Sequence, residues 1–176
     1  NYIAFYLLGY LLGENGFRRP GSNQAISRVV TISARLPRLL PSPLRVHAGL
    51  LIALLAAAGV AWLLNRSTLG FRLRAVGANQ NAARTAGMDV GRNYVISLLL
   101  AGGLAGLAGC SQILGTNSSI TGDIDAGIGF TGITVALLGR AKPWPIVLAG
   151  VLFGALQSGG VIMQSRTGTP IDLVTV

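Results

Sequence analysis

Long apolar segments alternate with short polar ones along most of the chain. The three longest, at 46–64, 93–114 and 144–164, contain no Asp, Glu, Lys or Arg. A helix that crosses a bilayer needs about 20 predominantly apolar residues, and each of these runs meets that length. The pattern therefore predicts an all-α integral membrane protein, in which residues 1–176 form one polytopic bundle of transmembrane helices.

Two further segments depart from this regular pattern. Residues 2–12 are apolar, and we interpret 1–12 as a truncated span and the chain as an internal fragment of a longer membrane protein. In 119–139 the first half, SITGDIDAG, is polar, and only IGFTGITVALLG resembles a membrane segment. Irregular backbone at membrane depth is tolerated where protein or water surrounds it, so 119–139 is predicted to be a broken or re-entrant helix.

Composition supports a membrane class and argues against binding to nucleic acid. The chain is 51% hydrophobic and 11% charged, with a mean hydropathy of +0.61, whereas soluble domains carry about 25% charged residues. The net charge is +9, but the 14 basic residues lie in or beside predicted loops, where membrane insertion commonly leaves them. If 119–139 crosses, Lys and Arg number seven on each face, so charge alone leaves the orientation open.

No motif in the chain indicates catalysis, a metal or a bound cofactor. His47 is the only histidine, so neither a catalytic triad nor a histidine metal cluster is expected. Lys142 is the only lysine and follows no phosphate-binding loop. GIGFTG at 127–132 matches G-x-G-x-x-G, but it opens a membrane segment and lacks the preceding strand of a dinucleotide site. We therefore expect no catalytic residue, no metal and no cofactor in this chain.

Neutral polar side chains on the predicted spans indicate a path for an uncharged polar solute. Ion-coupled carriers usually depend on ionisable groups within the membrane, and the apolar cores contain no Asp, Glu, Lys or Arg. The alternative, that these side chains only cross-link helices, stays open. The candidate path residues are Gln112, Phe130, Thr131, Thr134, Gln157 and Gln164.

Small residues recur at helical spacing and predict close helix packing. One stripe consists of Gly49, Ala53, Ala57 and Ala61. Two further pairs of glycines are spaced four residues apart, at 102 and 106 and at 150 and 154. In lipid, small residues let helix backbones approach closely.

The polar loop at 65–92 contains a predicted helix over 80–86. Asn79 suits its N-cap, and Gly87 stands where helices end in a left-handed residue. A helix this short is not stable alone in water. Its alanines form a smooth face, which favours docking in a groove of another protein. The alternative is a helix lying on lipid, with Phe71, Leu73 and Val76 turned inward.

Four stretches carry a family resemblance: TLGFRLRAVGANQNAARTAGMDV, GGLAGLAG, GIGFTGITVALLGRAKP and LFGALQSGGVIMQ. They resemble the membrane permease subunits of bacterial ABC importers, within the branched-chain amino-acid, ribose and simple-sugar permease superfamily. GFTGITVALLGR and GGVIMQ are most similar to its nucleoside-importing branch. The resemblance covers most of 46–176.

This resemblance implies that the 65–92 loop faces the cytoplasm and holds a coupling helix. That helix would dock on an ABC ATPase subunit, which binds the ATP, so this chain itself needs no cofactor. The residues matching the coupling motif are Gly77, Asn79, Ala82, Ala83, Arg84, Ala86 and Gly87.

The resemblance further implies a multi-pass permease in the bacterial inner membrane that moves a nucleoside by alternating access. Its expected partners are the ATPase, a second permease subunit in a homo- or heterodimer, membrane lipid and an extracytoplasmic solute-binding protein. The loop at 13–45, with Asp123 and Asp125, would meet the binding protein. The alternatives are a sugar or branched-chain amino-acid ABC permease, or an ion-coupled secondary transporter or channel.

Overall fold

The structure is a computed structural model that describes residues 2–13, 16–39, 46–122, 124 and 127–167. Its elements in chain order are helix α1 (Tyr2–Leu11), the 3-10 turn η1 (Ile32–Ala34), helices α2 (Gly49–Arg66), α3 (Thr68–Ala78), α4 (Gln80–Thr85) and α5 (Val90–Gln112), the π-turn η2 (Ile113–Asn117), and helices α6 (Ile128–Leu138) and α7 (Pro143–Thr167). Within these ranges, β pairing is limited to three isolated bridges. The predicted all-α fold is confirmed.

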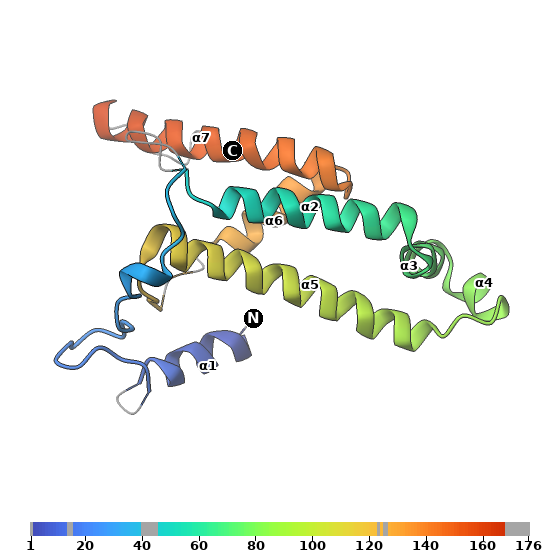
Figure 1. The fold of residues 1–176 in the computed structure, drawn as a ribbon, viewed down its shortest axis with the longest axis horizontal. Helices are drawn as coiled ribbons and strands as arrows, with labels where there is room; N and C mark the ends of the chain where they lie inside the picture. Colours follow the sequence, from blue (N-terminus) through green and yellow to red (C-terminus); the bar gives the residue numbers. More distant parts are fainter. Residues whose placement is uncertain (1, 14–15, 40–45, 123, 125–126, 168–176) are drawn as a thin grey trace.

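In the part of the chain that the structure describes, three helical segments are long and apolar enough to cross a membrane: α2, α5 with η2 (Val90–Asn117), and α7. They correspond to the apolar runs at 46–64, 93–114 and 144–164, with each helix shifted or extended by a few residues. Figure 1 shows α2, α5 and α7 side by side with similar axes. Large apolar side chains cover their outer surfaces, Leu55, Leu98 and Leu148 among them, as expected where the solvent is lipid rather than water.

The shorter apolar helices α1 and α6 fall within the two irregular segments of the sequence. In 119–139 the described residues before Ile128 are not helical, and α6 covers only the apolar half. Gly127, which precedes α6, has a φ of 77°, a backbone conformation that glycine adopts without strain. An 11-residue helix rises about 16 Å, roughly half the thickness of a bilayer core.

Residues of α2, α5, α6 and α7 line an open cavity of about 580 Å³. Its lining is apolar and includes Ala53 and Ala57 of the predicted small-residue stripe, opposite Gly150 of α7. In contrast, a Cβ added at Gly102 or Gly106 of α5 would meet nothing within 4 Å. That glycine pair therefore packs against no helix in the described part of the chain.

One end of the bundle carries α3, α4 and the turn between α6 and α7. Figure 1 shows α3 along its axis, so α3 runs across the ends of α2 and α5 rather than beside them, and α4 lies beyond it. The opposite end carries the segment 16–39, which is tied to the end of α5. Leu36 N–H donates to the carbonyl of Leu114 at 3.0 Å, and Val30 N–H to that of Ser118 at 2.8 Å. Asp123 and Asp125, which were expected to act with this segment, lie outside the described residues.

A sharp corner turns the chain from α2 into α3 within a single residue. The Ser67 hydroxyl donates to the carbonyl of Leu63 at 2.6 Å and accepts from the N–H of Gly70 at 2.9 Å. Ser67 thus closes the end of α2 and caps the start of α3. Gly70 is buried where α3 meets α2, and a Cβ there would lie 2.1 Å from the Leu63 carbonyl oxygen. The corner therefore requires glycine at position 70.

Candidate functional site

Asn79 links two helices in the loop that the sequence singled out. It ends α3 and begins α4, with an extended backbone (φ −156°, ψ 109°). Its Oδ1 accepts hydrogen bonds from the N–H groups of Asn81 at 3.0 Å and Ala82 at 3.1 Å. These bonds satisfy two of the amide donors that a helix start leaves without partners. The predicted N-cap is confirmed.

The other end of α4 stops in a left-handed glycine. Gly87 has a φ of 78°, and its N–H donates to the carbonyl of Arg84 at 3.0 Å. The N–H of Met88 donates to the carbonyl of Ala83, also at 3.0 Å. This pair of bonds is the Schellman pattern, in which the residue after the glycine also packs back on the last turn. The predicted stop at Gly87 is confirmed, although α4 itself ends at Thr85 with Ala86 as its cap.

The predicted smooth face of three alanines is wrong in one respect, because Ala83 is buried inside the chain. Ala83 is 3% exposed and belongs to a cluster with Val76 of α3 and Val90 of α5, against which Met88 packs. Burying these apolar side chains against α3 and α5 holds a helix that is too short to be stable alone. Ala82 and Ala86, one turn apart, are exposed.

The remaining residues of the motif lie on the outer surface of the same two helices. Gly77, Asn79, Arg84 and Gly87 are all exposed. One hydrogen bond ties α4 to the first turns of α5: the Gln80 amide donates to the hydroxyl of Tyr94. Within α5, the Asn93 amide donates to the carbonyl of its N-cap, Asp89, at 2.7 Å. The structure thus gathers the seven predicted coupling residues in one region, the elbow formed by α3, α4 and the turn to α5. Six of the seven lie on its surface.

Sequence reasoning missed α3, which forms most of this elbow. The signals were present: Ser67 is a good N-cap, and Leu69, Leu73 and Val76 recur at helical spacing. Val76, considered as a lipid-facing residue, instead packs with Ala83 and Val90, and Leu73 is half-buried, whereas Phe71 is 58% exposed. The arginines at 72 and 74 hid the pattern by making the segment resemble an irregular polar loop.

The predicted path residues lie on three elements, and the structure forms no polar cluster from them. Gln112 is half-buried at the end of α5, and Gln157 and Gln164 are exposed on α7. Thr131 of α6 donates to the carbonyl of Gly127 within its own helix at 3.3 Å, and Thr134 is exposed on the same helix. Phe130 lines a cavity of about 630 Å³ that lies against α1. None of the six lines the apolar cavity between α2 and α7.

His47 is a second position whose surroundings the sequence did not reveal. Its Nδ1 accepts from the N–H of Gly49 at 3.1 Å, and its Nε2 lies 3.4 Å from the Thr116 hydroxyl. A Cβ added at Gly115 would meet the imidazole ring at 2.4 Å. The ring therefore fills a notch between the start of α2 and the turn that ends α5. Among the described residues, no group of three His, Cys, Asp or Glu side chains is placed to hold a metal.

Three membrane-length helices, with an elbow of two short helices at one end, define a helical multi-pass membrane protein. Comparison with known families identifies which family of membrane proteins this is. The chain belongs to the family described as branched-chain amino acid transport system / permease component, whose model matches residues 1–174. A permease component is a transport subunit and not an enzyme.

Individual relatives are permeases of ABC transporters. The guanosine ABC transporter permease protein NupP of Bacillus subtilis is 36% identical over all of this chain and 51% of its own length. The glucose ABC transporter permease protein TsgB13 of Haloferax volcanii is 38% identical over 74% of the chain and 34% of its own length. The nucleoside ABC transporter permease protein NupB of Lactococcus lactis is 37% identical over 74% of the chain and 36% of its own length. The chain thus spans about half the length, or less, of these relatives, and no solved structure matches it significantly.

Proposed function

We propose that this chain is part of the permease subunit of an ABC importer that carries a nucleoside across a bacterial inner membrane. Two matches support this substrate class: one to a guanosine permease, which covers the whole of this chain, and one to a nucleoside permease. The observation that carries the coupling mechanism is the α3–α4 elbow, a small-faced helix clamped to the start of a membrane-length helix. ATP is bound and hydrolysed by a separate ATPase subunit.

In this mechanism α4 is the contact with the ATPase, and the elbow passes the movement on. Ala82 and Ala86 are exposed and small, so a groove on the partner can approach the backbone of α4 closely. Ala83, Met88 and Val90 pack together beneath them. A displacement of α4 therefore moves the first turn of α5 with it, because close-packed side chains transmit strain. The elbow end of the bundle is cytoplasmic in this proposal.

The solute path is proposed to follow the polar face of α7. Gln157 and Gln164 are two helical turns apart and share one face, where both are exposed. An amide facing hydrocarbon costs several kcal/mol, roughly 4–8 for transfer to cyclohexane, so this face requires a polar or wet neighbour. A water-filled path shared with the rest of the permease, or with a second permease subunit, satisfies both side chains. Gln112, Phe130, Thr131 and Thr134 are the other proposed path residues.

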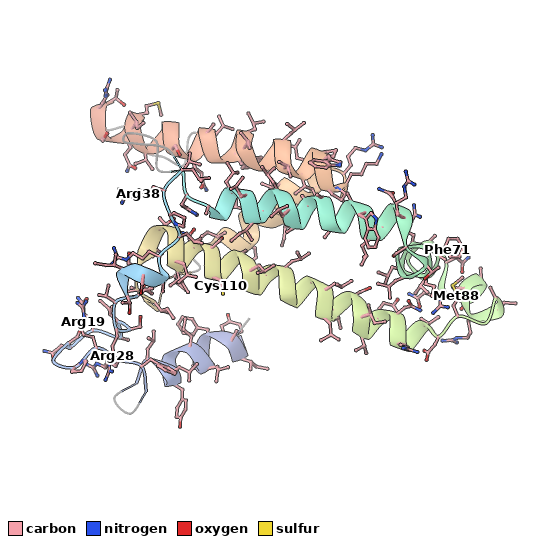
Figure 2. The ribbon with its side chains drawn as sticks, viewed as in Figure 1. Arg19, Arg28, Arg38, Phe71, Met88 and Cys110 are labelled. Carbon is pink, nitrogen blue, oxygen red and sulfur yellow. The ribbon has the colours of Figure 1, made fainter. Side chains whose placement is uncertain are left out.

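The remaining partners are assigned to the opposite end of the bundle. The segment 16–39 carries Arg18, Arg19, Arg28, Arg35 and Arg38, and Figure 2 shows Arg19, Arg28 and Arg38 well away from the elbow. In this proposal that end is extracytoplasmic and receives the solute-binding protein. Its basic side chains favour an acidic surface on that partner, because complementary charge speeds encounter.

The coupling role is tested with Ala82→Trp in the full-length permease, co-expressed with its ATPase. Ala82 is exposed, so the large side chain is accommodated without disturbing the Val76–Ala83–Val90 cluster. We expect the variant to insert and melt normally but to lose co-purification with the ATPase and ATP-dependent uptake. Ala82→Ser, which stays small, should retain both, and Ser165→Trp, at the other end of the bundle, should retain co-purification with the ATPase. Normal uptake by Ala82→Trp would refute docking through this face of α4.

The glucose permease relative favours a sugar as the second candidate substrate. Uptake of radiolabelled guanosine into proteoliposomes, with unlabelled nucleosides, glucose, ribose and leucine as competitors, separates the classes. We expect competition by nucleosides alone. Competition by sugars or leucine instead would replace the substrate class and leave the coupling proposal intact. Uptake that continues without ATP would point to an ion-coupled carrier or a channel.

A further inference from the structure

The outer face of α3 carries basic and aromatic side chains that have no part in the proposed contact with the ATPase. Gly70 and Val76 are buried on the inner side of this helix. Phe71, Arg72 and Arg74 are exposed on its other side. These exposed side chains lie next to Asn65 and Arg66, where the membrane-length helix α2 ends. A helix with one packed face and one basic, aromatic face is typical of the membrane interface.

A hollow of about 560 Å³ lies between this face, the end of α2 and the segment after α4. The hollow is shallow and open to its surroundings. Phe71 of α3 and Met88, which follows α4, both line the hollow, and Figure 2 shows them near each other. The lining residues are Asn65, Arg66, Ser67, Thr68, Phe71, Arg72, Arg74 and Met88.

The hollow is positively charged, and among the described residues no acidic side chain lines it. Three of its lining residues are arginines, whose planar guanidinium groups bind phosphate oxygens through paired hydrogen bonds. The single acidic residue between 65 and 92 is Asp89. Its Oδ1 accepts from the N–H of Arg92 at 3.0 Å, because Asp89 caps the start of α5. The arginine charge in the hollow is therefore available to an outside anion.

We propose that this hollow is a binding site for the headgroup phosphate of an anionic phospholipid. Arg66, Arg72 and Arg74 bind the phosphate, while Thr68 offers a hydroxyl to the headgroup. This inference requires only that the chain sits in a membrane, so it stands independently of the proposed substrate and of ATPase docking.

Lipid, rather than free phosphate, is the source of the anion because apolar surface adjoins the charge. Trp62, one helical turn before Arg66 on the same face of α2, is 64% exposed. Phe71 is 58% exposed beside the arginines. Aromatic side chains gather where headgroups meet acyl chains. A lipid bound in the hollow thus lays its acyl chains along Trp62 and the apolar surface of α2, whereas inorganic phosphate has no group to place there.

The test is lipid retention by the full-length permease complex, measured by native mass spectrometry after purification in mild detergent with added phosphatidylglycerol or phosphatidylcholine. We expect the wild-type protein to retain phosphatidylglycerol and not phosphatidylcholine. The variant R66Q/R72Q/R74Q should weaken retention by at least about tenfold, because each charge-assisted contact to phosphate is worth about that much. R66K/R72K/R74K, which keeps the charge, should retain the lipid better than the glutamine variant.

The matched control is R92Q/R140Q/K142Q, which removes the same charge near the same end of the bundle but outside the hollow. It should retain phosphatidylglycerol within about threefold of wild type, since it loses no direct contact. Equal losses in the two triple glutamine variants would reduce the effect to general surface charge and overturn the proposal. Full retention by R66Q/R72Q/R74Q, or displacement of the lipid by millimolar inorganic phosphate, would also overturn it. Unchanged melting midpoints confirm that each variant is folded.

Discussion

Replacing Gly70 by alanine should open the corner between α2 and α3. A Cβ at this position would lie 2.1 Å from the Leu63 carbonyl oxygen, 2.6 Å from Leu64 Cα and 2.8 Å from the Leu64 carbonyl oxygen. All three are backbone atoms, so no side-chain rotation can relieve the overlap. Overpacking of this kind costs about 1–3 kcal/mol.

Two further effects change the expected loss in the free energy of unfolding. Opening the corner breaks the bond from Gly70 N–H to the Ser67 hydroxyl, and loss of an N-cap costs about 1 kcal/mol. Against this, alanine is better than glycine in a helix by about 1 kcal/mol. The net loss in the free energy of unfolding is therefore about 1–3 kcal/mol.

Gly77 in the same helix provides the matched control. A Cβ there would meet nothing within 4 Å, so Gly77→Ala gains the helix preference without a clash and should be neutral or stabilising. The two variants should thus differ by about 2–4 kcal/mol. The assay is the melting midpoint of the full-length permease in detergent, followed by tryptophan fluorescence. If Gly70→Ala melts as high as Gly77→Ala, the tight α2–α3 corner is not the structure in solution.

Two other substitutions test the local geometry of the elbow and of the histidine notch. Asn79→Ala should lower the free energy of unfolding by about 1 kcal/mol and reduce ATP-dependent uptake, because α4 loses its cap. Asn79→Asp should keep the melting midpoint near wild type, because aspartate also caps helices. Equal midpoints for the two variants would show that the cap is not formed. Gly115→Ala should lower the midpoint by crowding the His47 ring, and adding His47→Ala should recover part of that loss; a double variant that is merely additive would contradict the contact.

Much of the elbow could be predicted from neighbouring residues because helix ends obey local rules. Asn79 caps α4 and Gly87 stops it through bonds that span only a few residues. Such bonds depend on the side chain and backbone at the position itself, so a short stretch of sequence specifies them. The start of α5 at Val90, capped by Asp89, follows the same rule, although the apolar run that predicted this span begins three residues later, at Asn93.

The surface that the elbow presents could not be predicted in the same way. Ala83 shares its small size with Ala82 and Ala86, and no local feature separates them. Ala83 is buried because Val76 and Val90, seven residues away on either side, meet over it when α3 and α5 converge. The same limit applies to His47 and Gly115, which are far apart in the chain and in contact only after folding.

The sequence by itself determined the class of this protein, the approximate spans, and the helix caps of the polar loop. It could do so because bilayer thickness sets the length of apolar runs, and because caps are satisfied within a few residues. The tertiary structure alone decided which small residues pack and which remain exposed, how α3 crosses the end of the bundle, and how three arginines come to line one hollow. Those features depend on where separate helices meet, and the order of residues along one helix does not contain that information.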